Sequence, residues 1–226
     1  MFHMRLFILK TYFCLTFLIS MLNHYNIRLV EPTDSFQCID IYRPYVESTA
    51  ITFDYEVPSV QDYNHKIEEI SSEYPWLVCT YMSKIIAYAY ASKLRVKAAY
   101  KWTVESTIYV NKEYHGKGIA RNLYTSLFDI LRLLGYLNVY AGVALPNSRS
   151  ESFHRSFGFY DVGTYKNIGF KFGRWHDVLW LQLHLDKHPS NPLPPKMITD
   201  KSVKSLISQE LQKANTIINK KDTILK

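Results

Sequence analysis

The sequence predicts a mixed α+β fold with a mostly antiparallel central sheet flanked by helices. Apolar residues make up 47% of the 226-residue chain, which is enough to build a hydrophobic core. A strand pattern and two helical patterns come first, and several strand patterns then alternate with two further helices. This order predicts a sheet covered by helices, and no internal repeat suggests another architecture.

The first half of the chain is expected to fold as a strand, two helices and three strands. Thr33 or Asp34 can cap the first helix, and Pro58-Ser59 can begin the second. Pro75 ends the second helix, and Ser83 provides a tight turn between two strands. The expected ranges are a strand at 27–30, helices to about 46 and from 58 to 74, and strands at 76–82, 84–91 and 102–110.

The second half begins with the strongest helical pattern in the chain. Ile119–Leu134 places leucines and isoleucines at helical spacing, and Gly135 follows as a stop signal. A strand at 137–143 and a short helix at 148–157 are expected next. Strands at 159–164 and 178–185 should enclose a loop, 165–177, that can itself pair.

The two ends of the chain are expected to lie outside the domain, which covers residues 26–185. Residues 1–25 hold an apolar run, 6–22, which fits a targeting or anchor segment, an extension packed on the domain, or an artefact of an upstream start codon. The pattern of residues 186–226 predicts a proline-containing linker and a basic, amphipathic helix. This tail could pack on the domain, meet a partner or lie on an anionic surface, and a loosely held tail is favoured.

Charge and cysteine usage narrow the class of protein. The net charge is +7, but residues 186–226 carry eight lysines against four acidic residues, so the body is only mildly basic. That distribution argues against a nucleic-acid partner. The three cysteines, Cys14, Cys38 and Cys79, are sparse and far apart, and no spacing suggests zinc. A cytoplasmic protein without a metal is expected, with membrane anchoring or secretion through the N-terminal segment as the alternative.

A glycine-containing turn between a strand and a helix is the main candidate for a binding site. His115-Gly116-Lys117-Gly118-Ile119-Ala120 leads into the helical pattern, where unpaired helix amides can bind an anion such as a pyrophosphate. A plain helix-start loop is an equal alternative on this evidence. Lys117 adds positive charge, but the spacing matches neither the Walker pattern nor GxGxxG.

Three further residues are candidates for chemistry, each with a structural alternative. Glu105 lies on the preceding strand, where burial would raise its pKa toward that of a usable base, although a solvent-facing residue is the more common case. His154 could transfer a proton, but a single helical histidine is more often a packed or surface residue. Asn147 is a natural helix cap.

Several long strings resemble the phosphinothricin (methionine sulfoximine) N-acetyltransferase group of the GNAT superfamily. The motif around residues 115–120 is similar to motif A of that superfamily, Gln/Arg-x-x-Gly-x-Gly/Ala, with His115 at the first position. Phe172 replaces a common histidine. The resemblance spans about residues 26–185, and the strings are TF (52–53), YPWLV (74–78), AYAYA (87–91), AYKWTVEST (99–107), LPN (145–147) and GFKFGRWHDV (169–178).

This resemblance implies the GNAT acyl-CoA N-acyltransferase fold and direct transfer of acetyl from acetyl-CoA to a small amino-acid-like amine. It implies that Glu105 and His154 are catalytic, and it suggests a homodimer. Arg95, Lys97 and Tyr100 would recognise the acidic head of the substrate. The residues implied to hold acetyl-CoA are Tyr109, Val110, His115, Gly116, Lys117, Gly118, Ile119, Ala120 and Asn147. The alternatives are another amine substrate, such as a polyamine or a peptide N-terminus, and a non-catalytic module that binds CoA.

Overall fold

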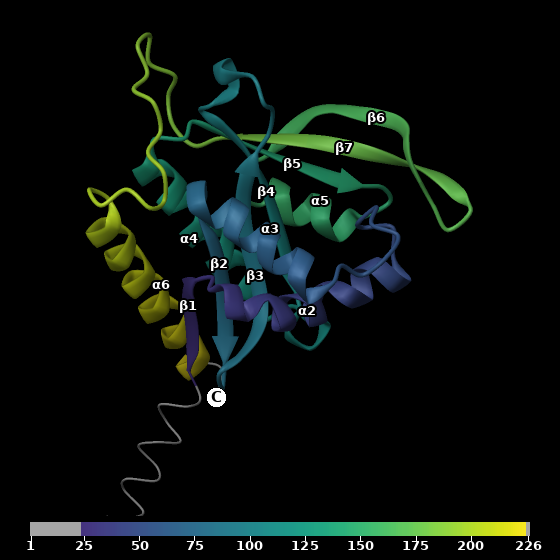
Figure 1. Cartoon of the computed structure of the whole chain (residues 1–226), viewed down its shortest axis with the longest axis horizontal. Coiled ribbons are helices and arrows are strands. Elements are labelled where there is room, and N and C mark those ends of the chain that lie inside the picture. The colour runs from purple at the N-terminus through teal and green to yellow at the C-terminus, as the bar shows by residue number, and fades with distance from the viewer. Residues whose placement is uncertain (1–23, 225–226) are drawn as a thin grey trace, which may run out of the picture.

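A seven-stranded sheet with the order β1-β2-β3-β4-β5-β7-β6 runs through the molecule (Figure 1). The computed structural model describes residues 24–224. Neighbouring strands are antiparallel except β4 and β5, so the predicted fold class is confirmed. The strands are β1 (Tyr25–Leu29), β2 (Trp76–Tyr81), β3 (Lys84–Lys93), β4 (Thr103–Val110), β5 (Asn138–Ala144), β6 (Tyr160–Lys171) and β7 (Arg174–His184).

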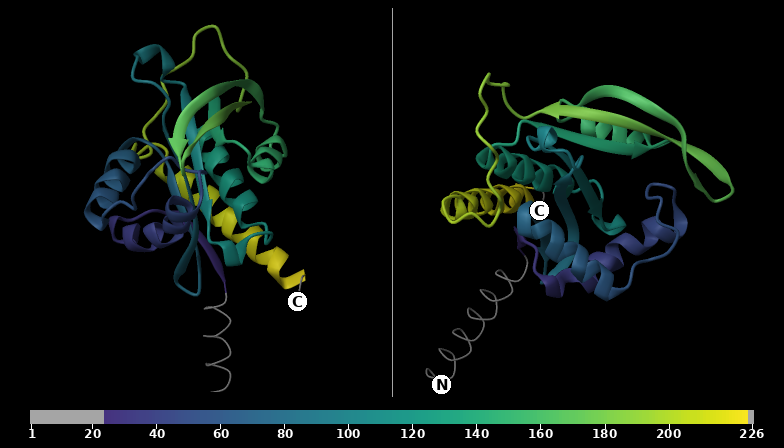
Figure 2. Two further views of the ribbon diagram at one scale, coloured as in Figure 1. Left: turned by 90° about the vertical axis from the view of Figure 1, so that its right-hand side faces the viewer. Right: turned by 45° about the horizontal axis from the view of Figure 1, so that its top comes forward.

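Helices cover both faces of the sheet (Figure 2). One face packs against α2 (Ser35–Ser48) and α3 (Val60–Glu73), and the core between this face and the two helices contains four buried tyrosines and Trp76. The other face packs against α4 (Ile119–Leu134) and α5 (Ser148–Arg155) over a larger, mostly aliphatic core. The predicted range of α4 is confirmed, and Gly135 ends the helix in the left-handed conformation at φ 90°.

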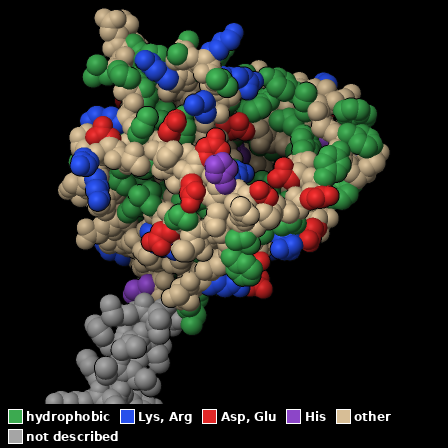
Figure 3. All heavy atoms as spheres, viewed as in Figure 1, with side chains coloured by type: hydrophobic (Ala, Val, Ile, Leu, Met, Phe, Trp, Pro, Cys, Tyr) green, Lys and Arg blue, Asp and Glu red, His purple; other side chains and the backbone are tan. Residues whose placement is uncertain are grey.

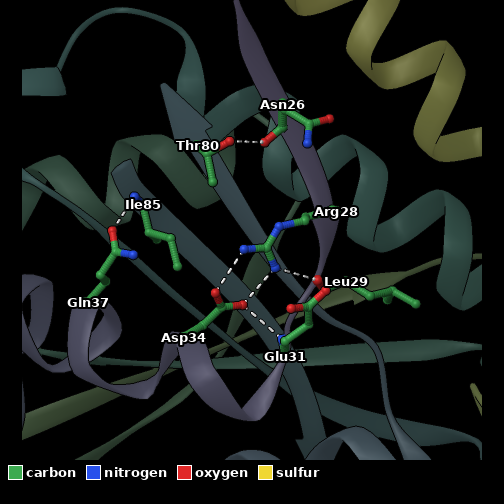
Figure 4. A network of polar contacts seen from close by, with 8 residues as sticks. All are labelled: Asn26, Arg28, Leu29, Glu31, Asp34, Gln37, Thr80 and Ile85. Carbon is green, nitrogen blue, oxygen red and sulfur yellow. Dashed lines mark hydrogen bonds and ion pairs between the residues drawn. The ribbon is translucent and has the colours of Figure 1, made fainter. Parts of the chain in front are cut away.

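Of the predicted helix caps, Ser59 does cap α3, whereas Asp34 does not cap α2. The Ser59 hydroxyl accepts a hydrogen bond from the Asp62 amide at 3.1 Å, as expected for a cap. Asp34 precedes α2, but its carboxylate does not cap the helix. It pairs instead with the Arg28 guanidinium at 2.7 and 2.8 Å and accepts from the Glu31 amide (Figure 4). Asp34 thus ties the start of α2 to β1.

The hairpin β6–β7 is longer than the two strands predicted around a loop. Residues 165–177 do pair, because Gly169 lies opposite His176 and Lys171 lies opposite Arg174. The register shifts between Tyr165 and Gly169, where the ladder is irregular. The hairpin therefore extends well beyond the helices on the sheet (Figure 1).

The C-terminal helix α6 (Lys204–Ile224) is packed on the domain, so the favoured interpretation of a loosely held tail is wrong. Figure 2 shows α6 alongside α4. Its buried residues are Ile207, Ala214 and Ile218, and they join the aliphatic core together with Val203, which directly precedes the helix. The apolar stripe was visible in the sequence, but the surface that receives it was not. The apolar run at residues 6–22, with its three alternative interpretations, lies outside the described residues, and none of the helices at 24–224 is long and apolar enough to cross a membrane.

Strands β4 and β5 separate where the candidate site lies. Their parallel ladder is limited to Thr103–Glu105 against Asn138–Tyr140. The rest of β4, up to Val110, has β3 as its ladder partner. The turn before α4 begins close to the end of β4, so the separation brings strand, turn and helix start to one place.

Candidate active site

A cavity of about 770 Å³ opens at the end of β4, beside the first turns of α4 and α5. Its wall includes Tyr45 and Thr49, which come from the end of α2 and the residue after it. Eight of the nine predicted cofactor-binding residues line it: Tyr109, Val110, His115, Gly116, Gly118, Ile119, Ala120 and Asn147. Lys117 is the exception, because its ammonium lies over the Tyr114 ring at 4.7 Å from the centroid and the residue is not part of the wall.

The turn before α4 requires glycine for conformational reasons. Gly116 and Gly118 have φ angles of 78° and 77°, a region that side chains other than glycine rarely adopt. Gly118 is also the residue that precedes α4, whose first amides have no partners within the helix. A positive helix end therefore faces the cavity, as an anion-binding site needs.

Three cationic side chains in the cavity wall strengthen that positive field. Arg121 and Arg149 come from the first turns of α4 and α5, and Lys112 comes from the short 3-10 helix after β4. None of the three was predicted from the sequence. Arg149 had a usable signal, because it stands two residues after the helix cap Asn147 and so belongs to a first helical turn.

His115 joins the turn to β4 and to α5 through both ring nitrogens. Its Nδ1 lies 2.7 Å from an Arg149 guanidinium nitrogen, which can only donate, so Nδ1 accepts. Nε2 then carries the proton and donates to the Val110 carbonyl at 3.0 Å. Burial and the charges of Arg149 and Lys112 lower the pKa of His115. A neutral imidazole thus holds Arg149 at the cavity.

Asn147 was predicted both to cap a helix and to bind the cofactor. It caps α5, and it also lines the cavity. Its side-chain oxygen accepts a hydrogen bond from the Ser150 amide at 3.2 Å. The cap aims the first turn of α5 at the same space as the first turn of α4.

Glu105 is half-buried on β4, opposite Tyr140 of β5. Burial raises the pKa of Glu105, and the positive charge of Arg95 partly opposes that shift. Arg95 lines a second, smaller cavity of about 140 Å³ together with Tyr140 and Trp180. Lys97 and Tyr100 are exposed and line neither of these two cavities. The structure thus places one of the three predicted substrate-binding residues near Glu105.

His154 is buried on α5, at 5% exposure, and does not line the large cavity itself. Its Nδ1 donates to the Ser150 carbonyl at 2.7 Å, so Nε2 accepts from the Tyr124 hydroxyl at 3.2 Å. The Ser150 hydroxyl lies 3.3 Å from Nδ1 and does belong to the cavity wall. Burial lowers the pKa of His154, which keeps the ring neutral near pH 7.

The Tyr124 hydroxyl connects His154 to Ser106 of β4, and these contacts were not predicted from the sequence. This hydroxyl lies 3.2 Å from the Ser106 hydroxyl and 3.2 Å from His154 Nε2, and all three side chains are buried. Tyr124 stands at an inward position of α4, so the pattern predicts only a core residue. Its position beside a histidine 30 residues away depends on the fold.

No group of three or more histidine, cysteine or acidic side chains within residues 24–224 could hold a metal ion.

Comparison with known proteins identifies several acetyltransferases that are similar to this chain. Residues 27–180 match a family model described as an acetyltransferase (GNAT) domain. A phosphinothricin N-acetyltransferase from Streptomyces viridochromogenes is 33% identical over 174 residues, which cover 77% of this chain and 94% of the relative. An L-methionine sulfoximine/L-methionine sulfone acetyltransferase from Salmonella typhimurium is 36% identical over 115 residues, which cover 51% of this chain and 67% of the relative.

A solved structure shares the fold. A phosphinothricin acetyltransferase from Sinorhizobium meliloti, crystallised with acetyl-CoA, superposes with a TM-score of 0.72 at 30% identity. The match covers 78% of this chain and 97% of that one. The whole of α6 and the residues before β1 lie outside the family match at residues 27–180.

Proposed function

The chain belongs to the GNAT acetyltransferase family, and from that premise we propose that it moves an acetyl group from acetyl-CoA to the free amine of a small amino-acid-like substrate. The proposed substrate class is the phosphinothricin or methionine sulfoximine type, which the names of two relatives specify for those proteins. The observation that carries the proposal is the large cavity where β4 ends, with its glycine turn and cationic wall.

The cavity has the features that acetyl-CoA requires. A pyrophosphate is an anion, and the start of α4 together with Arg121 and Arg149 provides amides and positive charge for it. The remaining wall, with Ile108, Tyr109 and Phe153, is largely apolar and suits a pantetheine chain. We therefore propose that the eight predicted residues in the wall help to hold acetyl-CoA.

Glu105 is the proposed base. A half-buried carboxylate with a raised pKa can take a proton from a substrate ammonium, directly or through water, and leave the free amine. The amine then attacks the thioester carbon in a ternary complex, a C–N bond forms, and the C–S bond breaks. Backbone amides at the open end of β4 are proposed to stabilise the developing oxyanion.

We propose that the departing thiolate takes the proton that the nitrogen releases when the C–N bond forms, passed on by the Ser150 hydroxyl, and that His154 holds this hydroxyl in place. The Ser150 hydroxyl lies 3.3 Å from Nδ1 of His154, and Ser150 lines the cavity. Tyr124 holds the other ring nitrogen, so the imidazole has one orientation. The histidine therefore acts through a neighbour in the cavity wall.

Direct transfer, without an acyl-enzyme, is favoured by the cysteines at 24–224. Cys38 and Cys79 are completely buried in the two cores. Burial raises the pKa of the Cys79 thiol to about 12 and also raises that of Cys38. Thiols in this state are poor nucleophiles.

The smaller cavity beside Glu105 is a proposed subsite for the acidic head of the substrate. Arg95 lines it, and guanidinium groups bind carboxylates and related anions well. Its volume of about 140 Å³ suits a small group. We assign Lys97 and Tyr100 only supporting roles, since both are exposed in the loop after β3.

The proposed assembly is a homodimer that uses the hairpin β6–β7. Its exposed hydrophobic residues are Tyr160, Val162, Tyr165, Ile168, Phe170, Phe172 and Trp175. A set of exposed hydrophobic side chains on one hairpin is typical of an interface between proteins.

An acetyl-CoA consumption assay across a panel of amines tests the proposal. Wild-type protein should release CoA with methionine sulfoximine, methionine sulfone or phosphinothricin and should form the N-acetyl product, detected by mass spectrometry. Glu105→Gln should lower kcat/KM by about 10²- to 10⁴-fold, the usual contribution of a positioned base. Glu68→Gln, an exposed residue of α3, is the matched control.

Two results would contradict the proposal. Acetylation of polyamines or peptide N-termini, with none of these amino acids acetylated, would reject the substrate class. Binding of acetyl-CoA without turnover of any amine, and with no effect of Glu105→Gln, would indicate a non-catalytic CoA-binding module.

A further inference from the structure

Two asparagine side chains of α6 occupy the free edge of β1. Strand β1 ends the sheet order, so one of its edges has no neighbouring strand within residues 24–224. There, the Ile27 amide donates to Asn215 Oδ1 at 2.6 Å, and Asn215 Nδ2 donates to the Ile27 carbonyl at 3.0 Å. Asn219 repeats this arrangement with the amide and carbonyl of Tyr25, at 2.9 and 2.8 Å.

The spacing of the two asparagines matches the spacing of the strand. Residues four apart on a helix rise by about 6 Å, and residues two apart on a strand are separated by about 6.6 Å. A side-chain amide has the same donor and acceptor as a peptide group. Asn215 and Asn219 therefore take the place of two residues of an antiparallel neighbour. Figure 4 shows the Asn26 side chain pointing toward α6, and Asn215 Nδ2 donates to it at 3.0 Å.

Hydrophobic packing holds α6 in this position. Val203 and the three buried residues of α6 fix the helix against α4 and the sheet, as described above. Leu211, one turn before Asn215, packs into the same core as Leu29 of β1. Positions 211, 215 and 219 thus follow residues 29, 27 and 25 in order, so the helix runs antiparallel to the strand.

The covered edge is complementary to itself. Residues 25, 27 and 29 direct their backbone N–H and C=O groups to this same edge, because a strand alternates. A second β1, antiparallel and centred on Ile27, would pair residue 25 with 29 and Ile27 with Ile27. Asn26 would then lie opposite Arg28, so no like charges would meet.

We propose that the edge of β1 is a strand-acceptor surface that α6 occupies within the chain, and that β1 of a second copy pairs with it when α6 is displaced. Exposed edges of this kind readily accept another strand. This surface lies at the opposite end of the sheet from the hairpin β6–β7. The inference does not depend on the proposed acetyl transfer.

A charge-matched pair of full-length variants tests the proposal. Asn215→Asp with Asn219→Asp places carboxylate oxygens against the carbonyls of Ile27 and Tyr25, which should release α6. Gln212→Glu with Thr216→Glu adds the same charge at the same spacing, but on an exposed face of α6. Hydrogen exchange and sedimentation velocity are measured for both variants and wild type at about 1 and 100 µM.

We expect the aspartate variant, but not the control, to exchange the amides of Tyr25 and Ile27 at least tenfold faster at 1 µM. At 100 µM its mass should be at least twice that of wild type. Unchanged exchange would overturn the proposal, and so would fast exchange with the wild-type mass at 100 µM. If the aspartates prevent folding, as circular dichroism would show, Asn215→Ala with Asn219→Ala removes the same hydrogen bonds without charge, and the same criteria apply.

Discussion

At the scale of single residues, the burial of Glu105 links activity to stability. Because the folded state raises its pKa, folded protein binds more protons than unfolded protein at pH values above the ordinary carboxyl pKa. Stability therefore falls as pH rises through this window. Glu105→Gln removes that cost, so the variant should have a higher Tm than wild type at pH 8 while it loses activity.

The Tm difference should disappear at about pH 4, where the carboxyl group is protonated in both states. Calorimetry at pH 4, 6 and 8 measures it, with the exposed Glu68→Gln as control. A lower Tm for Glu105→Gln at pH 8 would show that the carboxylate stabilises the fold, and it would remove the physical basis for a raised pKa.

A second residue-scale prediction concerns Tyr124. Tyr124→Phe leaves Nε2 of His154 without its donor in the core, which should reduce stability by about 1–3 kcal/mol. The histidine should also lose its fixed orientation, so kcat should fall about tenfold, with the KM for acetyl-CoA unchanged. The acidic limb of the pH–rate profile should move to higher pH, because the Tyr124 hydroxyl favours the neutral ring by donating to Nε2. Steady-state kinetics from pH 5 to 9 measure these effects.

Tyr136→Phe is the matched control, since Tyr136 is also buried but stands outside this set of contacts. A stability loss with an unchanged kcat and pH profile would assign Tyr124 a purely structural role.

At the scale of elements, Lys171 anchors the hairpin β6–β7 to the end of α2. Its buried ammonium donates to the carbonyls of Val46 and Thr52, at 2.8 and 2.9 Å. Lys171→Met would leave both carbonyls without this donor and should lower the free energy of unfolding by about 2–4 kcal/mol. The KM for acetyl-CoA should also rise, because the anchored segment includes Thr49 and Ile51 of the cavity wall.

Lys166→Met is the comparison for urea denaturation, because Lys166 lies on the same hairpin in an exposed ion pair with Asp177. Exposed pairs contribute about 0–1 kcal/mol. Equal losses for the two variants would mean that the buried anchor contributes no more than a surface pair.

Features that depend on neighbouring residues in the chain could be predicted from the sequence, and features that depend on distant contacts could not. The range of α4 was predictable because its periodicity, the turn before it and Gly135 all agree locally. The cofactor side of the candidate site was predictable for the same reason, since eight of its residues cluster at the ends of adjoining elements. Tyr124 and the packing of α6 were not, because both depend on contacts between residues far apart in the chain. Lys117 follows the motif, but its flexible side chain lies over Tyr114.

At the scale of the whole molecule, the exposed hydrophobic side chains of β6–β7 predict a homodimer. Its seven hydrophobic side chains are 44–60% exposed, and Figure 3 shows hydrophobic side chains gathered over the far end of the hairpin. Homodimers commonly use one self-complementary patch on both subunits. Wild-type protein should therefore sediment at twice 26.5 kDa. Ile168→Glu with Trp175→Glu should give a monomer, because each carboxylate would be desolvated in the interface.

The control for this pair must also place charge at exposed apolar positions. Val96→Glu with Leu193→Glu meets that condition, because these residues are 91% and 84% exposed and lie outside the hairpin. This variant should remain dimeric. A wild-type mass of 26.5 kDa, or a dimer that survives the hairpin substitutions and not the control, would place the interface elsewhere. Because β6 ends the sheet opposite β1, a hairpin dimer leaves the edge covered by α6 free of the interface, so the two surfaces can be tested separately in one molecule.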